Sequence, residues 1–142
     1  MSWVEEAKGG KIIASPHQLE IAWAAGFYDG EGSVSCGSNN GNPQTRIQLG
    51  IGQKNDGDKI AAVLERFKKA VGVGKIYRKT RKGKEINQHQ YLISKEKDVH
   101  KVINKLWPFM SYKKRYQATT AMAKLSEGKA WLKAKRERKY NG

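Results

Sequence analysis

Residues 24–33 read Ala-Ala-Gly-Phe-Tyr-Asp-Gly-Glu-Gly-Ser and place two carboxylates where a predicted helix ends. The helix begins at Ser15, a favourable N-cap residue, with Pro16 at the first helical position and Gln18 placed to complete a capping box. We expect the helix to stop near Gly30 and a strand to follow at once. This stretch therefore joins the first helix of the chain to its first strand.

The two carboxylates at this helix end need a physical reason. The helix dipole is negative at the C-terminus, so Asp29 and Glu31 are each disfavoured there by about 0.3–1 kcal/mol. The last carbonyl oxygens of the helix also lack partners. A hard divalent cation such as Mg²⁺ binds carboxylate and carbonyl oxygens together, so the pattern predicts a metal site. The simpler alternative is a glycine C-cap with both carboxylates in solvent.

Small residues mark one patch of the same helix, at Ala22, Ala25 and Gly26. Glycine inside a helix costs about 0.5–1 kcal/mol relative to alanine, so Gly26 should have a packing reason. Small side chains let two helix backbones approach closely. The patch therefore predicts close packing of this helix against another backbone.

Alternating and helical patterns continue through the rest of the chain. Strands are expected over residues 31–36, 44–54, 75–80 and 85–94, and further helices after Asn55 and Asp56, after Ser94 and from near Tyr112. The fold class is α/β of the α+β type, a single αββαββα domain with an antiparallel sheet covered by helices on one face. We divide the chain into an arm (residues 1–14), this domain (residues 15–127) and a basic tail (residues 128–142), of which the basic run from Lys133 to Lys139 is expected to fray.

The composition points to a polyanionic partner. The chain has 142 residues with 28 Lys and Arg against 13 Asp and Glu, a formal net charge of +15. Nucleic acid fits this charge best, although a ribosome-associated or merely soluble basic protein would share it. The lone Cys36 gives no disulfide framework and no cysteine-based zinc site. With no long apolar run and no signal segment, we expect no membrane partner and an intracellular location, in a prokaryotic cytoplasm or an organelle.

Residues 24–33 resemble the signature of the LAGLIDADG homing endonucleases. Three further segments fall where single-motif members of that family have comparable ones, namely Gln53-Lys54, Gly72-Val73-Gly74 and Pro108-Phe109 to Lys113, so the resemblance covers roughly residues 17–125. It implies a saddle-like DNA-binding sheet and a homodimer that makes metal-dependent double-strand breaks in a long, nearly palindromic DNA site, as in intron homing. The expected cofactor is Mg²⁺, with Mn²⁺ or Ca²⁺ as substitutes.

The resemblance also assigns roles to individual residues. Glu31 would be catalytic and would bind metal together with the Gly30 carbonyl, while Gln53 and Lys113 would act on water and phosphate. The dimer interface would be made by the motif helix, at Ala22, Ala25, Gly26 and Asp29. The chain departs from the family pattern at Ala24, where Leu is usual, and at Glu31, where Asp is common. A basic residue expected after Gln53 falls at Gly57, for which Lys54 or Lys59 could substitute.

The exposed faces of the predicted hairpins would read the DNA. Amide and basic side chains suit base edges in the major groove, because Gln pairs with adenine and Arg or Lys with guanine. The first hairpin offers Ser33, Ser35, Asn39, Gln44, Arg46 and Gln48, and the second offers Lys75, Tyr77, Lys79, Arg81, Gln88 and Gln90, with Lys82 beside them at the turn.

Three functions remain open at this stage. The first is a site-specific homing endonuclease, the second an RNA-binding maturase that assists intron splicing, and the third a DNA-binding regulator that does not cut. The acidic helix end disfavours the regulator, because a protein that only binds has no use for Glu31 beside bare carbonyls. A basic sheet face also suits structured RNA.

Overall fold

The computed structural model describes residues 15–39 and 42–141, with side chains at all of these except 38–39, 42–44 and 139–141. The predicted arm, residues 1–14, therefore lies outside the described residues. The first described helix is α2 (Pro16–Glu31), and its capping box is confirmed. The Ser15 hydroxyl accepts a hydrogen bond from the Gln18 backbone N–H at 3.1 Å, and the Gln18 side chain accepts one from the Ser15 N–H at 2.8 Å.

The remaining elements follow in the predicted order. They are β1 (Gly32–Asn39), β2 (Asn42–Lys54), α3 (Ala62–Val71), β3 (Lys75–Arg81), β4 (Lys84–Ile93), α4 (Glu96–Leu106), the short 3-10 helix η1 (Trp107–Phe109) and α5 (Tyr112–Asn141). The α+β class and the αββαββα order are confirmed. None of the described helices is long and apolar enough to cross a membrane.

Three local expectations differ from the structure. Helix α3 begins later than expected, and the Asp56 carboxylate reaches forward to accept a hydrogen bond from the Ala62 N–H at 2.8 Å. The N-cap of α4 is Lys95 instead of Ser94, without a side-chain cap. Residues 128–141 do not form a separate tail, because they continue α5 to its end.

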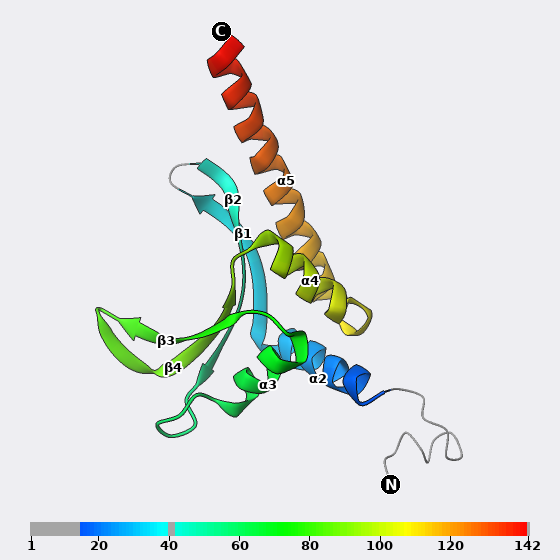
Figure 1. The fold of residues 1–142 in the computed structure, drawn as a ribbon, viewed down its shortest axis with the longest axis vertical. Helices are drawn as coiled ribbons and strands as arrows, with labels where there is room; N and C mark the ends of the chain where they lie inside the picture. Colours follow the sequence, from blue (N-terminus) through cyan, green and yellow to red (C-terminus); the bar gives the residue numbers. More distant parts are fainter. Residues whose placement is uncertain (1–14, 40–41, 142) are drawn as a thin grey trace.

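The four strands form one antiparallel sheet in the order β1-β2-β4-β3. The sheet is curved, and the helices lie on one side of it, leaving the other side open (Figure 1). The side chains between sheet and helices are the core, with Tyr28, Leu49, Phe67, Tyr91 and Leu106 fully buried. The layered arrangement thus exposes one whole face of the sheet.

Helix α5 covers the outer edge of β1, the strand at one end of the sheet. A strand in that position leaves every second backbone group without a partner from the sheet. The Lys114 ammonium group donates to the Gly32 carbonyl, and the Gln117 side chain accepts from the Val34 N–H at 3.4 Å. Side chains of α5 thus take the place of a fifth strand along this part of the edge.

Candidate nucleic-acid interface and metal site

The open face of the sheet gathers the predicted DNA-reading residues. Residues paired across an antiparallel ladder point to the same face, and the pairs Ser35↔Gln48, Gly52↔Gln90 and Tyr77↔Gln90 link the four strands. With the alternation along each strand, one face carries Ser33, Ser35, Arg46, Gln48, Lys75, Tyr77, Gln88 and Gln90.

The other predicted positions lie at the margins of this face. Lys79 reaches over the sheet, since a Cβ built on Gly52 would lie 3.7 Å from its Nζ. Arg81 pairs with Lys84 at the exposed end of the β3–β4 hairpin, and Lys82 follows in its turn. Asn39 and Gln44 lie in β1 and β2, but their side chains are outside the described residues.

Two glycines on the open face were missed by the sequence interpretation. Gly50 and Gly52 occupy the central strand β2 at positions whose side chains would project from this face. A Cβ on Gly50 would lie 3.1 Å from the Gln90 amide nitrogen, so the space is already filled from β4. Glycine inside a strand often marks a close approach of another backbone or ligand, and that signal was present in the sequence.

The two carboxylates at the end of α2 have different surroundings. Glu31 is exposed at the last position of the helix, next to the exposed Gly30. The Asp29 carboxylate instead accepts hydrogen bonds from the Ser111 N–H at 3.0 Å and the Ser111 hydroxyl at 3.2 Å. Asp29 thus ties the end of α2 to the start of α5 within one chain. Among the described residues, no group of three or more His, Cys, Asp or Glu side chains could hold a metal ion.

Two consecutive lysines at the start of α5 lie close to this helix end. Lys114 is bonded to the Gly32 carbonyl and lies 5.6 Å from the centre of the Tyr28 ring. Lys113 is exposed and lines a hollow of about 400 Å³ between α5 and β1 that also includes Ser35. Lys114 is therefore engaged within the fold, whereas Lys113 is available to a ligand. Beneath them Tyr28 is fully buried, and burial together with the Asp29 charge raises the pKa of its hydroxyl.

Gln53 lies on the helix-covered side of the sheet near the end of β2, not on the open face. It pairs with His89, whose side chain is buried and whose Nδ1 lies 2.5 Å from the Asn55 side-chain oxygen. Gln53 is half-buried. Gly57, where a basic residue was expected, has φ +62° in the turn before α3, a conformation that favours glycine. Of the suggested substitutes, Lys54 shares the open face with Gln88 and Lys59 lies in the exposed turn.

The outer face of α2 differs from the predicted patch in one residue. Ala25 is fully buried in the core of its own chain, so its assignment to a dimer interface is wrong. Ala22 is half-buried, and Gly26 and Gly30 are exposed one turn apart. A Cβ on either glycine would meet none of the described residues within 4 Å. Leu19, 37% exposed, lies on this outer face too, and sequence spacing did not single it out.

Aromatic contacts border the same face of α2. The Trp23 and Phe27 rings stack with centroids 5.4 Å apart, and the Arg66 guanidinium lies 3.7 Å from the centre of the Trp23 ring. Arg66 also donates two hydrogen bonds to Glu20, at 2.6 and 2.9 Å, which lowers the pKa of that carboxyl. These contacts hold α3 against α2 and leave the glycines uncovered.

Comparisons with known proteins agree with this architecture. Among solved structures, the homing endonuclease I-CvuI in complex with its target is 24% identical with a TM-score of 0.59, and the match covers 80% of this chain and 68% of that chain. The homing endonuclease I-TnaI is 22% identical with a TM-score of 0.57, covering 72% of this chain and 69% of that one. The archaeal intron-encoded homing endonuclease I-Vdi141I complexed with DNA is 23% identical with a TM-score of 0.55, covering 81% and 70%. At these identities the likeness shows the fold.

The sequence itself carries the family assignment. No curated protein matches the chain in sequence. The model of the LAGLIDADG endonuclease family matches residues 24–125, which begin inside α2 and end inside α5. This match spans well over half of the chain and contains the acidic helix end, all four strands and both lysines at the start of α5. The chain therefore belongs to the LAGLIDADG endonuclease family.

Proposed function

We propose that two copies of this chain form a homing endonuclease that binds duplex DNA on its open sheet faces and cuts both strands with the help of divalent metal ions. The observation that carries the proposal is the exposed Glu31 at the end of α2, beside an open face lined by amide and basic side chains. Structural neighbours support it, because I-CvuI was solved with its DNA target and Ca, and with DNA and Mg.

The proposed dimer joins the outer faces of two α2 helices. Among the described residues, neither Gly26 nor Gly30 has a neighbour that would exclude a side chain. Each still carries the helix-destabilising cost of glycine. A second helix backbone packed against them would explain both residues, because only small residues permit that approach. We assign Ala22, Leu19 and the two glycines to this interface.

The proposed metal site uses oxygen donors from both copies. The donor set fits Mg²⁺, since Glu31 supplies a carboxylate and Gly30 a backbone carbonyl, and hard cations prefer such oxygens with water and phosphate. One chain alone offers too few ligands among its described residues. A bound ion would activate water and stabilise charge on the phosphate.

Neighbouring residues would support the reaction. The exposed Lys113 would offset phosphate charge from the start of α5, and Gln53 would orient water near the end of β2. The buried pair of His89 and Asn55 would hold this end of β2 in register, because it ties β4 to the segment that follows Gln53.

DNA recognition would use the exposed side chains of the open face. We assign base contacts to Arg46, Gln48, Gln88 and Gln90, with Ser33, Ser35, Lys75, Tyr77 and Lys79 around them and Asn39, Gln44 and Arg81 toward the outer ends. Gly50 and Gly52 place no side chain of β2 on this part of the face, and Gln90 and Lys79 reach over them instead, so contacts to DNA there would come from β4 and β3.

The test is cleavage by the purified full chain and by Glu31→Gln. A selection on a large random DNA library with Mg²⁺ should return one long, nearly palindromic site that the wild-type protein cuts on both strands. Glu31→Gln should lower cleavage at least about 100-fold while leaving duplex affinity within a few fold, because the amide keeps the shape but loses the charge that binds metal.

The control is Glu65→Gln, which removes a carboxylate from the first turn of α3 and should cut like the wild type. Normal cutting by Glu31→Gln would contradict the metal assignment. If the library yields no cut product while the chain binds structured RNA tightly, the maturase function replaces the nuclease. Duplex binding without cutting would indicate a regulator.

A further inference from the structure

The C-terminal half of α5 is not required by the family match, which ends at residue 125. The helix nevertheless continues to Asn141, and it runs beside the β1–β2 hairpin and past its end (Figure 1). Its charge is strongly positive, with Lys129, Lys133, Lys135, Arg136 and Arg138 against Glu137 over residues 128–138. A long basic helix that projects beyond the fold indicates that it binds another molecule.

One side of this helix packs against the domain. Leu125 and Gly128 are buried, and Leu132 is half-buried one turn later. This apolar side anchors the helix as far as residue 132 and fixes the direction in which its other sides face.

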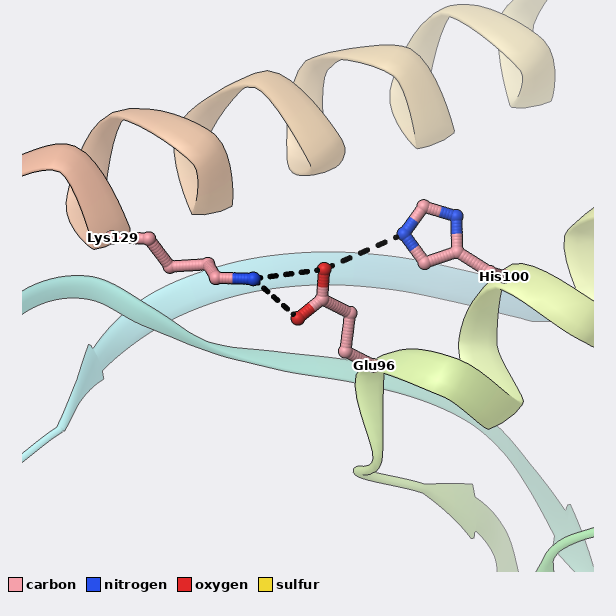
Figure 2. A network of polar contacts seen from close by, with 3 residues as sticks. All are labelled: Glu96, His100 and Lys129. Carbon is pink, nitrogen blue, oxygen red and sulfur yellow. Dashed lines mark hydrogen bonds and ion pairs between the residues drawn. The ribbon is translucent and has the colours of Figure 1, made fainter.

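The side of α5 toward α4 is partly neutralised. The Lys129 ammonium lies 3.0 Å from one Glu96 oxygen, and His100 lies 3.7 Å from the other, as Figure 2 shows. Lys133 and Arg136 follow Lys129 at intervals of one helical turn and so continue this side. Glu96 therefore already forms an ion pair with Lys129 at the base of this side.

The side of α5 toward β1 carries what we call the α5 stripe, made of Lys124, Trp131, Lys135 and Arg138. Their spacing of seven, four and three residues places them along one helix face. All four are exposed, Trp131 at 40%, and the Lys135 ammonium lies 5.1 Å from the centre of the Trp131 ring. Within residues 15–39 and 42–138, no carboxylate forms an ion pair with any cation of the stripe.

The α5 stripe is continuous with the open face of the sheet. Lys124 lines the hollow between α5 and β1, together with Ser35 from the open face and Lys113 near the proposed metal site. The charge of Lys124 acts on the Cys36 thiol, opposing the rise in its pKa that burial produces. Positive potential thus extends from the proposed site of cleavage along the edge of β1 to the projecting end of α5.

From this arrangement we infer that the α5 stripe is a second DNA-binding surface, which holds the sugar-phosphate backbone of duplex DNA next to the segment read by the sheet. The fourteen helical rises from Lys124 to Arg138 span about 21 Å, or roughly six base pairs of duplex. Unpaired cations with an interleaved indole suit a phosphate backbone. The inference rests on the proposed function, because it requires the sheet to bind duplex DNA.

The test compares two double variants of the full chain. Lys135→Gln/Arg138→Gln removes two charges from the stripe, and Lys133→Gln/Arg136→Gln removes the same two charges from the side toward α4. The probe is a 40-base-pair duplex of random sequence, several times longer than the roughly six base pairs that the stripe spans. Its affinity is measured by fluorescence anisotropy in EDTA over a range of salt concentrations, and circular dichroism confirms helix content.

The stripe variant should lower the slope of log K against log salt by about 1.8 for each bound chain, because each of its two lost phosphate contacts removes about 0.9. The control should change it by less than about 0.5. Equal changes in both variants would overturn the inference, since net charge alone would then be responsible. The inference would also be overturned if the stripe variant kept the wild-type salt dependence, or if it lost affinity for structured RNA but not for duplex DNA. If the wild-type chain fails to bind duplex DNA, the proposed function itself fails, and this outcome is distinct because no variant is needed to see it.

Discussion

Asp29 shows how a single residue of the motif can be structural while its neighbour two positions on remains exposed. Its carboxylate accepts from both the backbone and the side chain of Ser111, and Ser111 in turn accepts from the Lys114 N–H at 3.3 Å at the start of α5. The family resemblance placed Asp29 at the dimer interface, whereas its carboxylate is bonded to Ser111 within one chain. The sequence could not identify Ser111, because the two residues are brought together only by tertiary packing.

We predict that Asp29→Ala lowers the free energy of unfolding by about 1–2 kcal/mol, because it leaves the partners at a helix start without their acceptor. Urea denaturation of Asp29→Ala, Ser111→Ala and the double variant measures the effect. The two losses should be strongly non-additive if the residues act on each other. Simple additivity would show that the bond contributes little to stability.

Helix α2 illustrates which features of a helix or strand can be predicted from local sequence and which cannot. Its capping box and the strand alternation are local signals, so the element order could be predicted from residues a few positions apart. The direction in which each face of a helix or strand points could not be predicted from such local signals. Helix α2 carries small or apolar residues on both sides, so spacing alone placed Ala25 on the outer face, although it belongs to the core. Likewise, the side on which Gln53 lies depends on register with β4, a distant partner.

The outer face of α2 yields a prediction with opposite signs for two properties. In an isolated chain, Gly26→Ala should stabilise α2 by about 0.5–1 kcal/mol, because alanine favours helix and the added Cβ meets nothing within 4 Å. In the proposed dimer the same methyl group would separate the two backbones. Sedimentation should therefore show weaker self-association, together with unchanged or higher thermal stability at dilution. Unchanged self-association would exclude Gly26 from the interface.

The chain has a formal net charge of +15, and its described residues contain no group of three or more His, Cys, Asp or Glu side chains that could hold a metal ion. Basic residues line the open face and α5, and Glu31, the carboxylate to which we assign metal binding, is exposed at the end of α2. Composition could predict the class of partner, since charge acts over long distances. It could not predict the metal-ligand set that we propose, which comes from two copies.

The proposed sharing of the metal site between two chains can be tested with mixed dimers. Wild-type chain and Glu31→Gln, mixed equally and allowed to exchange, should give about one quarter of the double-strand cleavage of undiluted wild type, because only that fraction of a randomly assorted dimer has two intact chains. Gel assay of a linear substrate carrying the selected site measures this. A value near one half would mean that each chain cuts alone. The concentration control is wild-type chain diluted to the same extent with buffer in place of Glu31→Gln.

The contact between α5 and the edge of β1 also protects the protein from non-native strand pairing with other molecules. An uncovered strand edge is a template on which the strand of another molecule can pair, and such pairing seeds aggregation. Lys114 and Gln117 occupy backbone groups on that edge, and α5 lies alongside. Any shortened or rearranged version of the chain that loses α5 would expose the edge during expression, so insolubility, more than loss of cutting, would be its first symptom.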